Sequence, residues 1–123
     1  MKKSYSVLLT FFLCFSFTFS QVTTTIQDAI DAALEGDAVT IPAGTYAESL
    51  TIDKSITLSA SEGVILDVSG FTTGISIDID VTDVTIDGFT IIGDNLTGSG
   101  ITVSPGTENI TITNNNTLQT VLV

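Results

Sequence analysis

The chain has 123 residues, of which 43% are hydrophobic and 14% charged, and its formal net charge at pH 7 is −11. These values indicate one folded domain and exclude a disordered chain. With 14 acidic residues against 3 basic ones, the composition also excludes a nucleic-acid-binding protein, because neutralising phosphates requires Lys and Arg.

Residues 1–20 have the pattern of a secretory signal peptide. Lys2 and Lys3 precede an apolar run over residues 7–19, and Thr18 and Ser20 stand at positions −3 and −1 before Gln21. The apolar run is too short for a membrane span, which needs about 20 residues in a helix. We therefore predict a secreted or cell-surface protein with no membrane span in its mature chain.

The predicted mature chain, residues 21–123, contains no Cys, His or Arg and a single lysine, Lys54. One lysine against 14 acidic residues gives it a formal net charge of −13. A disulfide framework and a thiolate metal site are therefore both excluded.

A capping helix is predicted over residues 21–36. Thr24 or Thr25 can act as its N-cap, and Gln27 follows Thr24 at the capping-box spacing. Gly36 is a typical stop signal. We expect its apolar stripe to lie on the open end of a repeat structure, and the stripe consists of Ile26, Ala29, Ile30, Ala33 and Leu34.

From residue 37 onward, apolar residues alternate with polar ones, and the pattern repeats. The motif at 83–86 returns at 109–112, and the motif at 74–77 returns at 100–103, so both motifs have a spacing of 26 residues. This spacing predicts a solenoid. We expect its coils to span residues 37–116, with strands at 50–52, 56–58 and 64–66, then 75–77, 84–86 and 89–91, then 101–103 and 110–112.

Parallel stacking of these coils predicts which side chains lie over one another. Ile77 should lie between Ile52 and Val103, and Ile86 between Leu58 and Ile112. The intervening Thr and Ser residues should point outward. Gly88 is expected at a turn with positive φ, and one period later the tolerant residue Asn114 takes its place.

The runs "TIQDAIDAALEGDAVTIPAGTYAESLTIDKSITLSA", "VTIDGFTIIG" and "ITITNN" resemble the N-terminal cap and first coils of the pectin-lyase-like superfamily. The resemblance implies an all-β fold, a right-handed parallel β-helix of about three coils with a short N-terminal capping α-helix. Such proteins include lyases, hydrolases, esterases and non-catalytic surface proteins, so the resemblance implies a fold and leaves the activity open.

The resemblance implies two kinds of catalytic site. Lyases of the superfamily use a basic residue for proton abstraction, and only Lys54 and Tyr46 are candidates; we expect Lys54 to be a solvated turn residue and Tyr46 a packing residue with its hydroxyl at the surface. Hydrolases use paired carboxylates, and Asp78 and Asp80 should emerge on one outer face if Ile79 points inward. A solvated acidic edge is the preferred interpretation of this pair.

Two features of the sequence are candidates for binding sites. Asp78, Asp80, Asp83 and Asp87 lie within ten residues and form a candidate Ca²⁺ site, because this ion prefers hard oxygen ligands; no other cofactor is predicted. The outward Thr ladders are similar to ice-binding surfaces, although β-branched residues also simply suit exposed strands.

Residues 117–123 are predicted to form an uncapped tail after the last coil. The tail marks either a truncation point of a longer β-helix or a segment that pairs with another chain, and we expect self-association through this C-terminal coil. The preferred functional hypothesis is a secreted, non-catalytic β-helix segment that binds polysaccharide or another cell-surface component. The alternative is the N-terminal part of a polysaccharide-degrading lyase, pectin esterase or glycoside hydrolase whose catalytic coils lie downstream.

Overall fold

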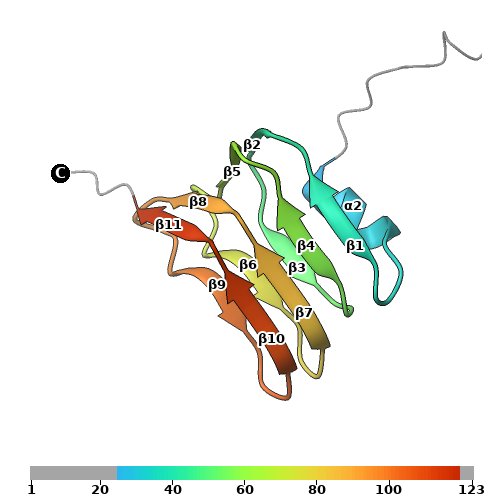
Figure 1. The fold of residues 1–123 in the computed structure, drawn as a ribbon. Helices are drawn as coiled ribbons and strands as arrows, with labels where there is room; N and C mark the ends of the chain where they lie inside the picture. The colour runs from blue at the N-terminus through green and yellow to red at the C-terminus, as the bar shows by residue number, and fades with distance from the viewer. Residues whose placement is uncertain (1–24, 120–123) are drawn as a thin grey trace, which may run out of the picture.

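A computed structural model describes residues 25–119, which form a short helix followed by eleven strands wound into a solenoid (Figure 1). The elements are α2 (Ile26–Ala32), β1 (Ala38–Ile41), β2 (Gly44–Tyr46), β3 (Leu50–Ile52), β4 (Thr57–Ala60), β5 (Val64–Asp67), β6 (Thr73–Ile77), β7 (Thr82–Asp87), β8 (Thr90–Gly93), β9 (Ser99–Val103), β10 (Glu108–Thr113) and β11 (Asn116–Gln119).

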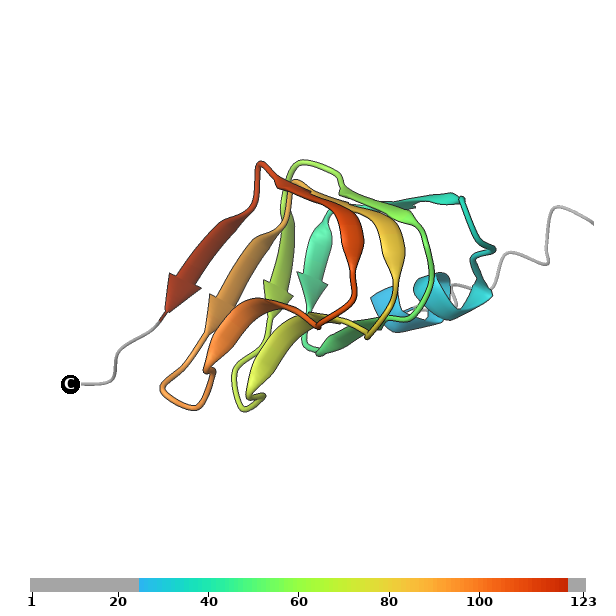
Figure 2. The same cartoon turned by 90° about the horizontal axis from the view of Figure 1, so that it is seen from below.

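The strands form three parallel sheets. Sheet A has the order β1-β4-β7-β10, sheet B β2-β5-β8-β11 and sheet C β3-β6-β9. Each complete coil contributes one strand to each sheet, so there are three complete coils, preceded by a partial one made of β1 and β2. Figure 2 shows these coils stacked one behind the other, with α2 at the N-terminal end. The predicted parallel β-helix with an N-terminal helix is confirmed.

The predicted stacking is also confirmed, residue by residue. Ile77 pairs with Ile52 on one side and with Val103 on the other. Ile86 pairs with Leu58 and Ile112. In the first two complete coils these inward side chains have no exposed surface and form the core of the solenoid.

The third coil is longer than the sequence indicated. β11 pairs with β8, with Thr117 opposite Ile91, so residues 117–119 belong to a strand and the predicted tail boundary at 117 is wrong. The alternation of apolar and polar residues did not indicate this strand, because Thr117 occupies the inward position that Ile91 occupies one coil earlier. Residues 120–123 of that predicted tail lie outside the described residues, as does the predicted signal peptide.

The expected inward position of Ile79 is wrong as well. β6 ends at Ile77, and Ile79 lies in the following turn with 64% of its surface exposed. Asp80 adopts a positive φ of 59° there, which breaks the alternation of a strand. The two aspartates at 78 and 80 are therefore turn residues and do not share a strand face.

Stacked residues with positive φ lie at both ends of β7 and β10. Gly88 and Asn114 have φ values of 85° and 54°, as predicted. Asp83 and Asn109 form a second such pair, with φ values of 56° and 55°. Gly and Asn tolerate this region better than most residues, so these turns can repeat from one coil to the next.

The helix begins after Thr25, one of the two predicted N-caps, and is shorter than the predicted range 21–36. Thr25 is the N-cap: its Oγ1 accepts a hydrogen bond from the Asp28 amide at 3.0 Å, and the Asp28 carboxylate accepts one from the Thr25 amide at 3.4 Å. Asp28 thus completes the capping box in place of Gln27. The helix ends at Ala32, short of Gly36, and Leu34 is 72% exposed. Only Ile26 and Ile30 of the predicted stripe are buried.

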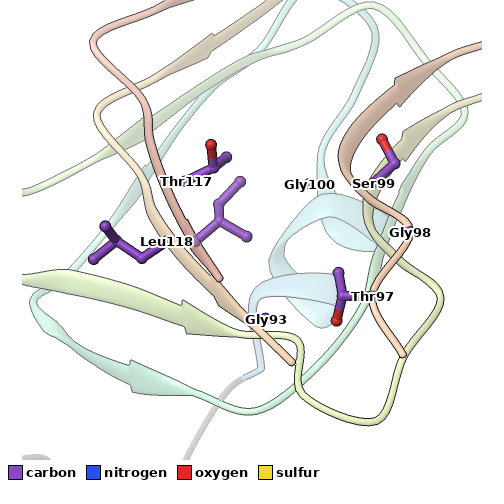
Figure 3. Close-up of a pocket in the computed structure, with 8 residues that line it drawn as sticks. Gly93, Thr97, Gly98, Ser99, Gly100, Thr117 and Leu118 are labelled. Atoms are coloured by element: carbon purple, nitrogen blue, oxygen red, sulfur yellow. The ribbon is translucent and has the colours of Figure 1, made fainter. Parts of the chain in front are cut away.

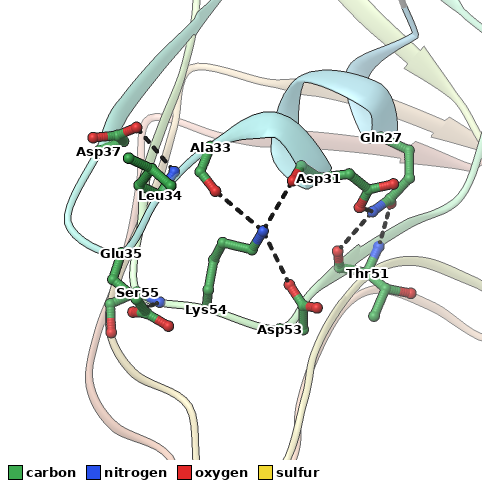
Figure 4. Close-up of polar contacts among 10 residues, drawn as sticks. All are labelled: Gln27, Asp31, Ala33, Leu34, Glu35, Asp37, Thr51, Asp53, Lys54 and Ser55. Carbon is green, nitrogen blue, oxygen red and sulfur yellow. Dashed lines mark hydrogen bonds and ion pairs between the residues drawn. The ribbon is translucent and has the colours of Figure 1, made fainter.

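The first complete coil holds this helix through polar groups (Figure 4). The Gln27 side chain donates to the Thr51 carbonyl at 3.1 Å and accepts from the Thr51 amide at 2.9 Å, so it occupies the place of a neighbouring strand's peptide at the edge of β3. The Ile26 amide donates to the Glu48 carboxylate at 2.6 Å. The N-terminal end of the solenoid is thus closed by apolar and polar contacts together.

Lys54 is part of the same closure, which corrects its prediction as a solvated residue. Its Nζ donates to the carbonyls of Asp31 and Ala33 at 3.3 and 3.2 Å, and only 18% of its side chain is exposed. Carbonyls at a helix C-terminus lack partners within the helix and attract a positive charge. The only cation of the described residues therefore caps the C-terminus of α2.

No helix among residues 25–119 is long and apolar enough to span a membrane.

Candidate functional site

The outer side of sheet A carries two rows of short polar side chains, which we call the hydroxyl face. Thr57, Thr85 and Thr111 pair in register across β4, β7 and β10. The second row runs two residues further along the same strands and contains Thr40, Ser59, Asp87 and Thr113. Neighbouring strands lie about 4.8 Å apart and the two rows about 6.6 Å apart, so the face is a regular grid.

The hydroxyls of this face are available for binding. Within residues 25–119, those of Thr57, Thr85 and Thr111 make no hydrogen bond, and the three residues are half-buried or exposed. The face arises because β-branched residues suit outward strand positions, while the alternate positions of the same strands fill the core. What the grid can do chemically is form many weak hydrogen bonds along one flat surface.

Amide and carboxylate side chains border the grid at both ends of the strands. Asn109 Nδ2 donates to Asp83 Oδ1 at 3.0 Å at one border. Asn114 Nδ2 donates to Asp87 Oδ1 at 2.8 Å at the other. Each bond joins one coil to the next, so both aspartates have a structural role between coils.

The four aspartates predicted as a Ca²⁺ site are not brought together. Asp78 and Asp80 lie after β6, whereas Asp83 and Asp87 lie near opposite ends of β7, four residues and therefore about 13 Å apart along the strand. Among residues 25–119, no three His, Cys, Asp or Glu side chains are placed to hold a metal ion. Closeness in sequence is a poor guide here because a turn separates Asp78 and Asp80 from β7, and an extended strand separates Asp83 from Asp87.

Neither candidate for the proton-abstracting residue of a lyase, Lys54 or Tyr46, has a free side chain. Lys54 is engaged at the helix end, as described above. Tyr46 packs against the core, and its hydroxyl donates to the Pro42 carbonyl at 2.8 Å. The prediction of Tyr46 as a packing residue is confirmed.

A hollow of about 240 Å³ lies in the third coil beside β8, β9 and β11 (Figure 3). Gly93 and Gly100 line it together with Ile91 and Thr117, and no charged side chain does. The hydroxyl of Thr97 at its rim already donates to the Val68 carbonyl at 3.2 Å. Pockets for small ligands start at about 300 Å³, so this hollow is better explained as the space left by small residues at the end of the core.

A second, open hollow of about 370 Å³ lies between the turn at 53–55 and the turn at 78–82. It contains Glu35, Asp53 and Asp80, but the Glu35 carboxylate accepts a hydrogen bond from the Ser55 amide at 2.9 Å. The Asp80 carboxylate lies against Gly106 of the next coil, and any side chain at position 106 would collide with it. Glu35 and Asp80 thus contribute to the packing of the turns.

Scans of the chain against protein-family models, curated proteins and solved structures found no match. The assignment of a function therefore depends on the surface features of this fold.

Sequence reasoning missed one residue that organises the third coil, Asn115. Its side chain accepts a hydrogen bond from the Phe89 amide and donates one to the Ile86 carbonyl, both at 2.8 Å. The detectable signal was an asparagine one period after the apolar Phe89. The polar side chain there binds the backbone of the coil below instead of extending the core.

One carboxyl on sheet B has a shifted pKa. Hydrogen bonds from the Ser69 side chain and amide, the latter at 3.0 Å, lower the pKa of Asp67 from its usual value. Any stability that this bond contributes is present above the usual pKa of an aspartate and is lost as the pH falls through the lowered one. This group serves a turn and no reaction.

Proposed function

We propose that this protein is a secreted, non-catalytic β-helix that binds an extended neutral polysaccharide, or another neutral component of a cell surface, along the hydroxyl face. The single observation that supports this function is the in-register grid of hydroxyls, unpaired within residues 25–119, across β4, β7 and β10. A polymer with a repeating pattern of hydroxyls can match a protein surface with a repeating pattern of its own.

Charge favours a neutral ligand over an acidic one. The chain carries 14 acidic residues and no arginine, and its only cation within the described residues is engaged at α2. A uronate polymer would meet like charge on every side, which opposes association. The signal-peptide pattern of residues 1–20 supports a location where such polymers occur.

The enzyme alternative draws its support from the resemblance to the pectin-lyase-like superfamily. Against it stand the two turn aspartates, which do not face one another on a strand, and the engagement of Lys54. We therefore propose the membership of that superfamily for the fold and a binding role for this chain.

Affinity electrophoresis in gels that contain a neutral or a uronate polysaccharide tests the proposal. Neutral polymer should retard the protein, and Thr85→Lys should weaken retardation about tenfold, because a long side chain would hold the polymer away from the grid. Ser76→Lys is the matched control, since Ser76 lies outward on the same coil but on sheet C. Retardation that both variants weaken equally, or no retardation by any polymer, would refute the proposal. Polysaccharide turnover by the purified chain would favour the enzyme.

A further inference from the structure

Asp87 is the only charged side chain in the two rows of the hydroxyl face. The other members of the rows are threonines and one serine, whose hydroxyls can both donate and accept hydrogen bonds. β7 lies between β4 and β10 in sheet A (Figure 1), and Asp87 pairs in register with Ser59 on one side and Thr113 on the other. The face therefore has one charged acceptor on an interior strand, with a hydroxyl-bearing residue about 4.8 Å away on each side.

The Asp87 carboxylate is positioned by one hydrogen bond and keeps most of its capacity to accept others. Asn114, which follows β10, donates from its Nδ2 to Oδ1 of Asp87 at 2.8 Å. The second carboxylate oxygen makes no hydrogen bond within residues 25–119, and Asp87 is half-buried. A carboxylate has about four acceptor positions, so the bond from Asn114 limits the rotation of the group and leaves the other positions to a ligand.

Two hydroxyls on adjacent carbons of a sugar ring match this carboxylate. Each of its oxygens can accept a hydrogen bond from one hydroxyl of the pair, as it would from the two nitrogens of an arginine. Such bonds are charge-assisted and stronger than bonds between two neutral groups. The hydroxyls of Ser59 and Thr113 can bind the rest of the same sugar unit from both sides.

The same carboxylate acts against an acidic sugar. A uronate over Asp87 would place two negative charges in contact, and the only cation of the described residues, Lys54, is engaged at α2. Physiological salt limits the reach of a charge to about 8 Å. It thus weakens the repulsion from distant acidic residues and leaves that from a carboxylate in contact with the ligand. A single side chain can therefore favour one ligand class and reject another.

We propose that Asp87 is the specificity-determining residue of the hydroxyl face and that it binds two adjacent hydroxyls of a neutral sugar unit. This inference rests on the proposed function, because Asp87 acts within the same binding face. It narrows the ligand to neutral polymers whose linkage leaves two neighbouring ring hydroxyls free.

Affinity electrophoresis with two soluble neutral glucans tests this role. In one glucan the linkage leaves adjacent ring hydroxyls free, and in the other the linked oxygen lies between the free ring hydroxyls. Asp87→Asn keeps the shape of the side chain and the bond from Asn114 but removes the charge. We expect its dissociation constant for the first glucan to rise about fivefold, because a hydrogen bond to a charged group contributes more than one to a neutral group. The unmodified protein should bind the second glucan more weakly, and Asp87→Asn should change that binding little.

Asp83→Asn is the matched control. Asp83 also accepts a hydrogen bond from an asparagine of the next coil, Asn109, at 3.0 Å. It lies about 13 Å from Asp87 along β7 and outside the two rows. This variant loses the same charge and should bind both glucans like the unmodified protein. Mobility in a gel without polymer corrects for the lost charge, and thermal unfolding checks that both variants are folded.

The outcomes separate this inference from the proposed function. Equal effects of the two variants, or equal retention of the unmodified protein by the two glucans, would overturn the role of Asp87. The hydroxyl face would then remain the binding site if Thr85→Lys still weakened retention. No retention by either glucan would also overturn this inference, and no retention by any neutral polymer would overturn the proposed function with it.

Discussion

The two ends of the solenoid differ in how completely the apolar core is covered. At the N-terminal end, α2 covers the core and polar side chains occupy the edge of β3, so Leu50 and Ile52 are fully buried. At the other end, Val103 and Ile112, which lie in the same stacks as Ile52 and Leu58, are 43% and 44% exposed. In a repeat structure the side chains of each coil are buried by the neighbouring coils. The position of a residue along the stack therefore decides how much its side chain contributes to the stability of the fold.

The largest expected effect compares one inward column at two heights. Ile86→Asp should destabilise the fold by about 4–5 kcal/mol, because an unpaired carboxylate would be buried between two coils. Ile112→Asp, one coil later, should cost about 1 kcal/mol, because the residue is almost half exposed.

Urea denaturation of both variants at the same low protein concentration, followed by far-UV circular dichroism, measures this difference. Thr85→Asp, adjacent to Ile86 but on the outer side, is the control and should be tolerated. Equal destabilisation by Ile86→Asp and Ile112→Asp would mean that the third coil is covered as fully as the second.

A smaller effect is expected at Asn115, a polar residue between β10 and β11 of the third coil. Asn115→Ala should cost about 2 kcal/mol, because the Phe89 amide and the Ile86 carbonyl would lose their partner. Asn116→Ala is the control, since this neighbour is exposed and its side chain makes no hydrogen bond within residues 25–119. Thermal unfolding checks both, and equal melting temperatures would show that water replaces the Asn115 side chain.

The repeat was the part of the fold that the sequence could predict well. Stacked coils require the same alternation at a fixed spacing, so Ile77 and Ile86 could be placed between their neighbours without a structure. Prediction failed where the pattern is interrupted. Asp80 has a positive φ in the turn after β6, and Thr117 continues an apolar column with a polar residue.

The candidate site was less predictable than the fold. The outward Thr and Ser rows follow directly from the alternation, but the proposed metal ligands depended on sequence proximity, which a solenoid does not preserve. Lys54 illustrates the limit most clearly. Its local sequence indicates a solvated turn, and its partners, the carbonyls of Asp31 and Ala33, lie more than twenty residues away.

The smallest expected effect tests the closed end at that lysine. Lys54→Met keeps the apolar stem of the side chain and removes the ammonium group, so it isolates the capping of the α2 carbonyls. We expect a loss of about 1 kcal/mol, because the carbonyls of Asp31 and Ala33 would lose a charged donor at the negative end of the helix but remain accessible to water.

Asp53→Asn is the matched control. The Asp53 carboxylate lies 3.9 Å from the lysine Nζ and is 58% exposed, and an ion pair of this kind contributes little. Urea denaturation of the two variants at neutral pH separates the interactions. If Asp53→Asn proved as destabilising as Lys54→Met, the lysine would act through the ion pair, and the N-terminal end would owe its closure to the helix's apolar contacts, Gln27 and Glu48.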